Sequence, residues 1–197
     1  MSGTGGNPQG KGMVPVLDEW RGAQAGLVEA KPVQQLLTDY FVTLLVLSAE
    51  FNFKPVRGTD YYLFLAGTRW KLSLISPEEW GERAPGPCLG QCRLLADMTW
   101  TISPQDNLDA SPEVRQALQA FHRGFLEMLD SANTLEAGLP HYVSNLPFYR
   151  RLLAAGLAGS LARSLELGGL TRRPAGFWLE AAGATPLLAS AEQEFSL

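Results

Sequence analysis

The sequence predicts an α+β protein: a small antiparallel sheet of three to four strands, packed by helices from both ends of the chain. Apolar residues recur at helical spacing after Pro32 and again after Pro112. Between residues 51 and 102, aromatic and aliphatic residues instead alternate with polar ones, as in strands. A composition that is 46% hydrophobic and 10% aromatic supplies enough apolar surface to bury a core.

The expected organisation is one domain between two tails. Gly, Asn, Pro and Gln dominate the N-terminus, so nothing there can pack against a core. We expect a flexible tail at 1–12, a single α+β domain at 13–180 with its sheet region at 51–102 and its helical region at 105–168, and a C-terminal tail at 181–197.

The first helix is predicted to begin near Pro32, a residue favoured at the first helical position, and to end near Leu47. Residues 41–47 are rich in β-branched side chains and could also form a strand, but the length of the periodic pattern favours a helix. Residues 13–20 are expected to form a short strand or an extended segment.

A hairpin is predicted next. The apolar run 61–65 is followed by the turn residues Ala66 to Thr68 and by alternation over 70–74. A third strand is expected at 89–96, with 98–102 continuing it after a bend.

Helices return in the second half of the chain. Ser111-Pro112-Glu113 combines a cap, a proline and a first-turn acid, which marks a helix start. Another helix is expected from about Leu146 to Leu167, ended by Gly168-Gly169, and a last short strand at 177–179.

The sheet region carries an ordered set of motifs: Asn52-Phe53-Lys54, Tyr61-Tyr62-Leu63-Phe64, Ser76-Pro77-Glu78-Glu79-Trp80-Gly81, Leu89-Gly90 and Asp97-Met98-Thr99-Trp100-Thr101. Their order and spacing over residues 51–101 resemble a family of small bacterial and eukaryotic proteins classed as a domain of unknown function. The resemblance implies no activity, because that family has none assigned.

The segment from Ser76 to Gly81 has two interpretations. Ser76, Glu78, Glu79 and Trp80 could line a ligand site, but Ser76 with Glu79 also forms the pattern of a helix capping box. The capping interpretation predicts a short helix that stops at Gly81. It also predicts that Trp80 anchors this helix on the sheet and that Trp70 and Trp80 are both largely buried.

No metal or cofactor site is predicted. Cys88 and Cys92 could be joined only by His122 and His141, which lie far along the chain, so a four-ligand zinc site is not favoured. Asp97 could act as an acid or base, or its side chain could cap the bend after the third strand. The chain has no nucleophile-elbow, P-loop or dinucleotide motif.

Charge and cysteine content restrict the partners and the compartment. A net charge of −4 gives no general attraction to nucleic acid. Arg150, Arg151 and Arg163 could bind an anion or an acidic membrane surface, but they do not form one basic stripe on the predicted helix and are interpreted as ordinary solvated side chains. Two cysteines, with no apolar stretch that could act as a signal or a membrane span, predict a soluble cytoplasmic protein.

The functional hypothesis is a non-enzymatic interaction or adaptor module that presents the aromatic sheet region to a protein partner. The alternative is a small-molecule or cofactor-binding enzyme with a pocket between sheet and helices, using Ser76, Glu78 and Asp97. A membrane-surface role for the arginine-containing helix is a third possibility. The sequence does not predict the oligomeric state. The predicted binding residues are Ser76, Glu78, Glu79, Trp80, Asp97 and Trp100.

Overall fold

The described part of the molecule is built on one four-stranded sheet. The computed structural model describes residues 27–105, 111–131 and 148–184. Its antiparallel strands follow the order β2-β1-β3-β4, which confirms the predicted α+β class. The strands are β1 (Asp60–Ala66), β2 (Arg69–Ser73), β3 (Cys88–Leu94) and β4 (Trp100–Pro104).

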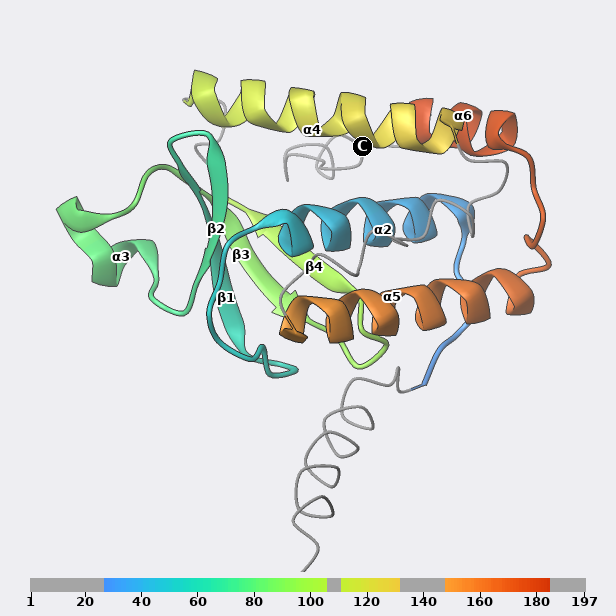
Figure 1. Ribbon diagram of the computed structural model, residues 1–197, viewed down its shortest axis with the longest axis horizontal. Coiled ribbons are helices and arrows are strands. Elements are labelled where there is room, and N and C mark those ends of the chain that lie inside the picture. Colours follow the sequence, from blue (N-terminus) through green and yellow to red (C-terminus); the bar gives the residue numbers. More distant parts are fainter. Residues whose placement is uncertain (1–26, 106–110, 132–147, 185–197) are drawn as a thin grey trace, which may run out of the picture.

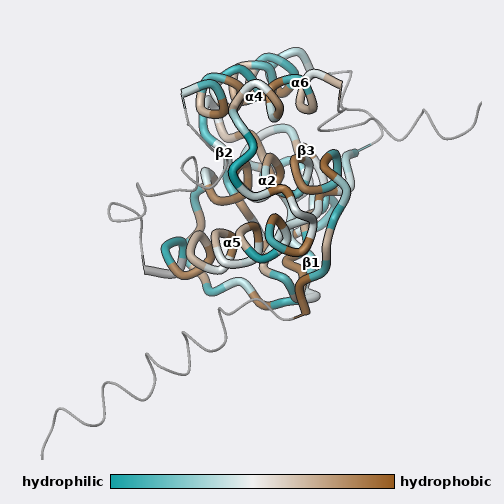
Figure 2. The backbone as a smooth tube through the Cα atoms, turned by 90° about the vertical axis from the view of Figure 1, so that its right-hand side faces the viewer, coloured by the Kyte–Doolittle hydropathy of each residue, from teal (hydrophilic) through white to brown (hydrophobic). Residues whose placement is uncertain are grey.

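The long helices lie on one side of the sheet and a short helix lies on the other (Figure 1). On the helical side, α2 occupies the middle, with α4 and α6 along one flank and α5 along the opposite flank, as Figures 1 and 2 both show. The helices are α2 (Val33–Ser48), α4 (Pro112–Ser131), α5 (Phe148–Leu167) and α6 (Ala175–Gly183), with α3 (Pro77–Trp80) on the far side.

The apolar sequence of α2 explains its central position. Its residues from Leu36 to Leu47 are buried almost without a break, apart from a half-buried Thr38. A helix that is apolar on most sides must be surrounded by protein. The Phe41 ring packs edge-on against Phe121 and Phe125 of α4, at centroid distances of 5.4 and 5.3 Å.

Strand alternation determines which face of the sheet meets α2. Leu63 pairs with Leu72 and Leu65 with Trp70, and all four side chains join the main core. The intervening Lys71 is exposed on the opposite face, and the Phe64 side chain there is fully buried although it lies outside the main core cluster. The two faces therefore have different coverings, the long helices on one and the α3 segment on the other (Figure 1).

The last strand of the sheet differs from its prediction. β3 ends at Leu94, and β4 returns antiparallel to it instead of continuing it after a bend. The Leu95 N–H donates to the Thr99 carbonyl at 2.9 Å, and Met98 adopts a left-handed conformation with φ of 68°. These features form a tight turn, which the sequence suggested only as a bend.

The predicted strand at 177–179 is wrong, because these residues lie inside α6. Trp178 and Ala182 are one helical turn apart and both are buried. The Phe-Trp-Leu run resembles a strand in isolation, but the alanines that follow it favour a helix. The helix runs to Gly183, past the expected start of the C-terminal tail, and the expected segments 1–12 and 13–20 lie outside the described residues.

Candidate functional site

The short helix α3 has the capping box that its sequence predicts. The Glu79 N–H donates to Ser76 Oγ at 3.2 Å, and the Glu79 carboxylate accepts the Ser76 N–H at 3.0 Å. The helix ends at Gly81, whose φ of 54° suits glycine. Glu78 and Glu79 remain exposed at its surface.

Trp80 connects α3 to the sheet but stays partly exposed. Its indole Nε1 donates to Ser73 Oγ at 3.1 Å, which confirms its role as an anchor. The expectation that it is largely buried is wrong, whereas Trp70 is buried as predicted. A four-residue helix covers too little of the sheet to bury the whole indole.

Two exposed apolar residues lie between β2 and α3. Leu74 is 52% exposed and Ile75 is 42% exposed, directly after the end of β2. β2 is an edge strand whose outer side is bridged by Glu50, through backbone hydrogen bonds with Trp70 and Leu72. A hollow of about 700 Å³ lies between the end of β2 and residues 51–53. Phe51, Phe53, Leu74 and Ile75 line this hollow, and Trp80 lies beside it through its hydrogen bond to Ser73. We call the surface of these five residues the Leu74–Ile75 patch.

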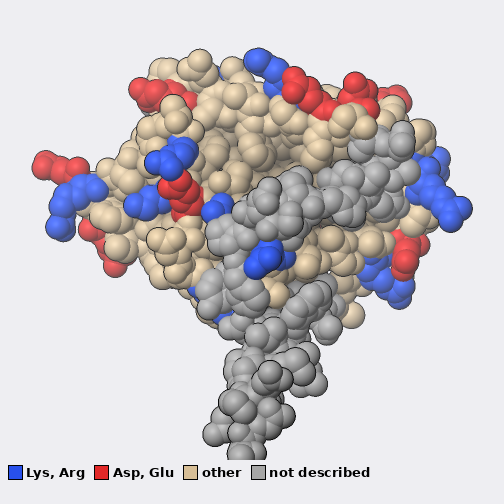
Figure 3. All heavy atoms as spheres, viewed as in Figure 1, with Lys and Arg blue, Asp and Glu red and all other residues tan. Residues whose placement is uncertain are grey.

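Charged groups of both signs border this patch. Lys71 and Arg150 line the hollow, whereas Glu78 and Glu79 project from α3. Burial raises the pKa of Tyr62, and the charges of Asp60, Glu78 and Glu79 raise it further. The acids of α3 are therefore close enough to influence the outer face of the sheet. Figure 3 shows red and blue side chains together at the left edge, the end of the molecule where α3 lies in Figure 1.

Asp97 is part of a buried ionic cluster. Lys31 Nζ lies 2.5 Å from a carboxylate oxygen of Asp97 and 2.5 Å from one of Asp39. The second Asp97 oxygen accepts the Thr99 N–H at 3.1 Å, which is the turn-capping role that the sequence suggested. Burial alone would raise the pKa of Asp97, but the hydrogen bonds from Lys31 and Thr99 outweigh it and hold that pKa below its usual value.

Trp100 belongs to the core and not to a surface. Its side chain is fully buried and meets the Tyr61 ring edge-on, at 5.6 Å between centroids. The backbone N–H of Trp100 donates to Thr43 Oγ1 of α2 at 2.9 Å, which connects β4 to the central helix. The predicted residues thus divide into two groups. Ser76, Glu78, Glu79 and Trp80 lie on the α3 side, whereas Asp97 and Trp100 contact groups on the helical side.

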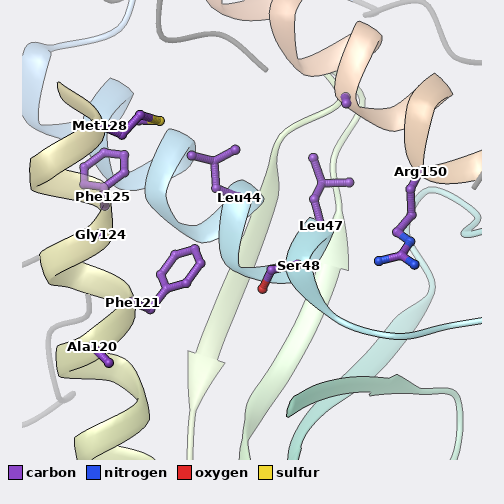
Figure 4. Close-up of a pocket in the computed structure, with 10 residues that line it drawn as sticks. Leu44, Leu47, Ser48, Ala120, Phe121, Gly124, Phe125, Met128 and Arg150 are labelled. Carbon is purple, nitrogen blue, oxygen red and sulfur yellow. The ribbon is translucent and has the colours of Figure 1, made fainter. Parts of the chain in front are cut away.

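A second hollow, of about 530 Å³, lies between helices α2, α4 and α5. Figure 4 shows Phe121, Phe125 and Met128 of α4 along one wall and Leu44 and Leu47 of α2 along another. Arg150, in the first turn of α5, lies at the other end of the hollow, beyond Leu47 (Figure 4). The hollow is lined by Leu44, Leu47, Ser48, Ala120, Phe121, Gly124, Phe125, Met128, Arg150 and Ala154.

Arg150 is held in place more firmly than its interpretation as a solvated side chain implies. Its Nη1 donates to the Ala49 carbonyl at 3.2 Å, and its guanidinium lies over the Phe51 ring, 5.8 Å from the centroid. Its Nε is buried and has no hydrogen-bond partner among the described residues. Arg151 and Arg163 are exposed as expected.

Sequence reasoning missed Lys31 and the contacts that hold Arg150 in place. Lys31 joins carboxylates that lie 8 and 66 residues further along the chain, and Arg150 contacts a carbonyl 101 residues before it. Such separations leave no periodic pattern to find. The local feature that could have drawn attention to Lys31 is its position directly before Pro32, where α2 begins.

The two cysteines are poorly suited to chemistry. Cys88 and Cys92 are free, and burial raises the pKa of the Cys88 thiol to about 11. Burial raises the pKa of Cys92 further still. Within the described residues no group of three or more His, Cys, Asp or Glu side chains converges, and His141 lies outside them.

No helix in the described ranges combines the length and the apolar character needed to cross a bilayer.

No solved structure matches the chain with significance. Residues 31–123 match the family model described as Protein of unknown function (DUF2452). The match confirms the resemblance seen over 51–101 and extends it over α2 and the first half of α4. The part of the chain that forms the sheet, the central helix and the Leu74–Ile75 patch is therefore similar to the DUF2452 family of unknown function.

Proposed function

We propose that the protein is a non-enzymatic interaction module of the cytoplasm that docks a protein partner on the Leu74–Ile75 patch. The observation that carries this proposal is the pair of large, adjacent, exposed apolar side chains at the end of an edge strand, beside a hollow of about 700 Å³. Exposed apolar groups rimmed by polar ones are typical of interaction sites.

The burial of the aromatic residues supports this smaller surface over the whole aromatic face of the sheet. Tyr61, Phe64, Trp70 and Trp100 are all buried, so none of them is available to a partner. Tyr62 and Trp80 remain partly exposed, and both lie next to Ser73, through strand pairing and through a hydrogen bond respectively. Among the aromatic residues of the strands and α3, the accessible ones therefore lie beside Leu74 and Ile75.

The proposed partner is an extended protein segment with apolar side chains and a basic residue. The apolar side chains would enter the hollow beside Phe51 and Phe53, and the basic residue would face Glu78. An edge strand is the usual place for an extended segment to bind, and on β2 such a segment would lie past the bridge that Glu50 makes with Lys71. The net charge of −4 favours such a partner over nucleic acid.

The state of the cysteines supports the cytoplasmic assignment. Cys88 and Cys92 belong to the same strand, and neither forms a disulfide. Proteins of oxidising compartments commonly use their cysteines in disulfides, whereas cytosolic proteins keep them reduced.

A peptide selection on the full chain tests the docking surface. Peptides that bind the parent protein are selected from a displayed random library and measured against Ile75→Asp and Leu167→Asp. Leu167 is a matched control, because it is 44% exposed against 42% for Ile75 and lies on α5. We expect Ile75→Asp to weaken binding at least tenfold, since a buried charge replaces an anchor at the centre of the interface.

Selected peptides that bind Ile75→Asp and the parent equally, or that lose affinity only for Leu167→Asp, would contradict the proposal. A second variant tests the charge of the rim. Glu78→Lys should slow association at low salt and leave the dissociation rate nearly unchanged, because rim charges act mainly on encounter. Glu113→Lys, an exposed acid at the start of α4, should leave both rates unchanged.

A further inference from the structure

We infer that the hollow between α2, α4 and α5 is a binding site for a single-chain amphiphile with an anionic head, such as an alkyl carboxylate. This site shares Arg150 with the hollow beside the Leu74–Ile75 patch, but its other walls come from α2, α4 and α5, on the opposite side of the sheet from α3. The inference rests on its size, on its apolar walls and on Arg150.

The size and the walls suit an alkyl chain. A volume of about 530 Å³ lies within the roughly 300–1,000 Å³ that is typical of small-molecule sites. Leu44 and Leu47 form one wall, and Phe121, Phe125 and Met128 form another (Figure 4). Methionine and aromatic side chains adapt to flexible apolar ligands.

Arg150 determines the chemistry of the head group. Among the described residues that line the hollow, Arg150 carries a charge and the others do not. Its Nη1 is used by the Ala49 carbonyl, and its buried Nε donates to no acceptor in the described part of the chain. A buried donor without a partner carries an uncompensated cost of desolvation, which an anion would remove.

The guanidinium geometry favours a carboxylate. A carboxylate binds two adjacent N–H groups of an arginine side by side, and Nε forms one half of such a pair. The contacts with Ala49 and Phe51 already fix the plane of the guanidinium, so little further ordering is needed on binding. A cationic head would be repelled, and an uncharged one would leave the donor only partly compensated.

Calorimetric titration of the full chain with dodecanoate, below its micelle concentration, tests the site. Dodecanol and dodecyltrimethylammonium serve as uncharged and cationic controls with the same alkyl chain. We expect dodecanoate to bind with one-to-one stoichiometry and at least tenfold more tightly than either control. Dodecyl phosphate is a further arm, which separates a requirement for carboxylate from a requirement for any anion.

Two variants locate the site. Gly124→Leu places a side chain into the hollow, where a Cβ at this position meets no atom within 4 Å. It should remove binding, whereas Gly159→Leu, on a helix with equally open surroundings, should retain it. Arg150→Gln should abolish the preference for dodecanoate over dodecanol. Ile75→Asp should change neither the affinity for dodecanoate nor this preference.

Several results would overturn the inference. They are no dodecanoate binding by the parent, equal binding of dodecanol, or unchanged binding by Gly124→Leu. If Arg150→Gln failed to fold, the comparison of Gly124→Leu with Gly159→Leu would still decide the matter, because neither substitution alters a buried contact.

Discussion

Replacing Lys31 by Met should destabilise the protein strongly at neutral pH. The side chains of Asp39 and Asp97 are only 5% and 11% exposed, and Lys31 is ion-paired with both. Removing one partner of a fully buried ion pair costs roughly 3–5 kcal/mol. Lys31 is 19% exposed, and Gln35 and Thr99 still donate to the carboxylates. We therefore expect a loss of about 2–3 kcal/mol in the free energy of unfolding.

The pH dependence distinguishes this ionic effect from a loss of packing. The folded-state pKa of Asp97 is lowered, so the stability it contributes is present above its unfolded pKa of 3.8 and is lost as pH falls through the folded value. Burial tends to lower the pKa of Lys31, but its bonds to Asp39 and Asp97 raise it overall. Its contribution is therefore complete below pH 10.5 and is lost only as pH rises through the folded value.

Without Lys31 the pKa of Asp97 is no longer lowered by that ammonium group and is raised by burial, so protonation of Asp97 stabilises the variant relative to the parent as pH falls. Urea unfolding at pH 7 and at pH 3 measures the difference in unfolding free energy between the parent and Lys31→Met at each pH. The deficit of Lys31→Met should shrink to below about 1 kcal/mol at pH 3. Lys71→Met, at an exposed lysine of β2, should stay within about 0.5 kcal/mol of the parent at both values. A deficit of equal size at pH 7 and pH 3 would refute the ionic explanation.

Two further predictions follow from close contacts and from burial. Gly90→Ala should cost about 1–3 kcal/mol of unfolding free energy, because its Cβ would lie 2.3 Å from the Ser103 carbonyl oxygen of β4. Gly159→Ala, which meets no atom within 4 Å, should gain roughly 0.5–1 kcal/mol in the same urea assay, and equal effects at both glycines would count against the close approach of β3 and β4. With a pKa of about 11 against an ordinary 9.0, the Cys88 thiol should react with iodoacetamide at pH 8 about 100-fold more slowly in the folded protein than in urea. A folded-state rate within tenfold of the unfolded rate would contradict the burial of this thiol.

Local sequence signals predicted most of the elements of the fold. Pro32, the capping box at Ser76 and the Pro112 start each have a local physical cause, and the structure places helices at all three. The hairpin follows from alternation around a glycine turn at Gly67. The strand prediction at 177–179 was wrong because a short apolar run fits a strand and a helix equally well. Only the packing of Trp178 and Ala182 in the core distinguishes the two.

The candidate sites were less predictable, because they depend on contacts between distant segments. Asp97 and Trp100 stand close to the α3 motif in the sequence, yet the turn at Met98 and the docking of β4 on Thr43 turn them toward the helical side. Leu74 and Ile75 read as the end of a strand, and only the short reach of α3 leaves them uncovered. The position of the Arg150 guanidinium is fixed by Ala49 and Phe51, and no residue near Arg150 in the sequence indicates these contacts.

The indole resonances of the full chain provide the most direct test of the proposed docking surface. The Trp80 Nε1–H bonds to Ser73 beside the patch, whereas Trp100 and Trp178 are buried in the main core. In an amide and indole correlation spectrum titrated with a peptide selected on the parent, we predict that the Trp80 indole signal shifts while those of Trp100 and Trp178 stay in place. A Trp80 signal that stays fixed at saturation would contradict docking at the Leu74–Ile75 patch, and so would shifts confined to the two buried tryptophans.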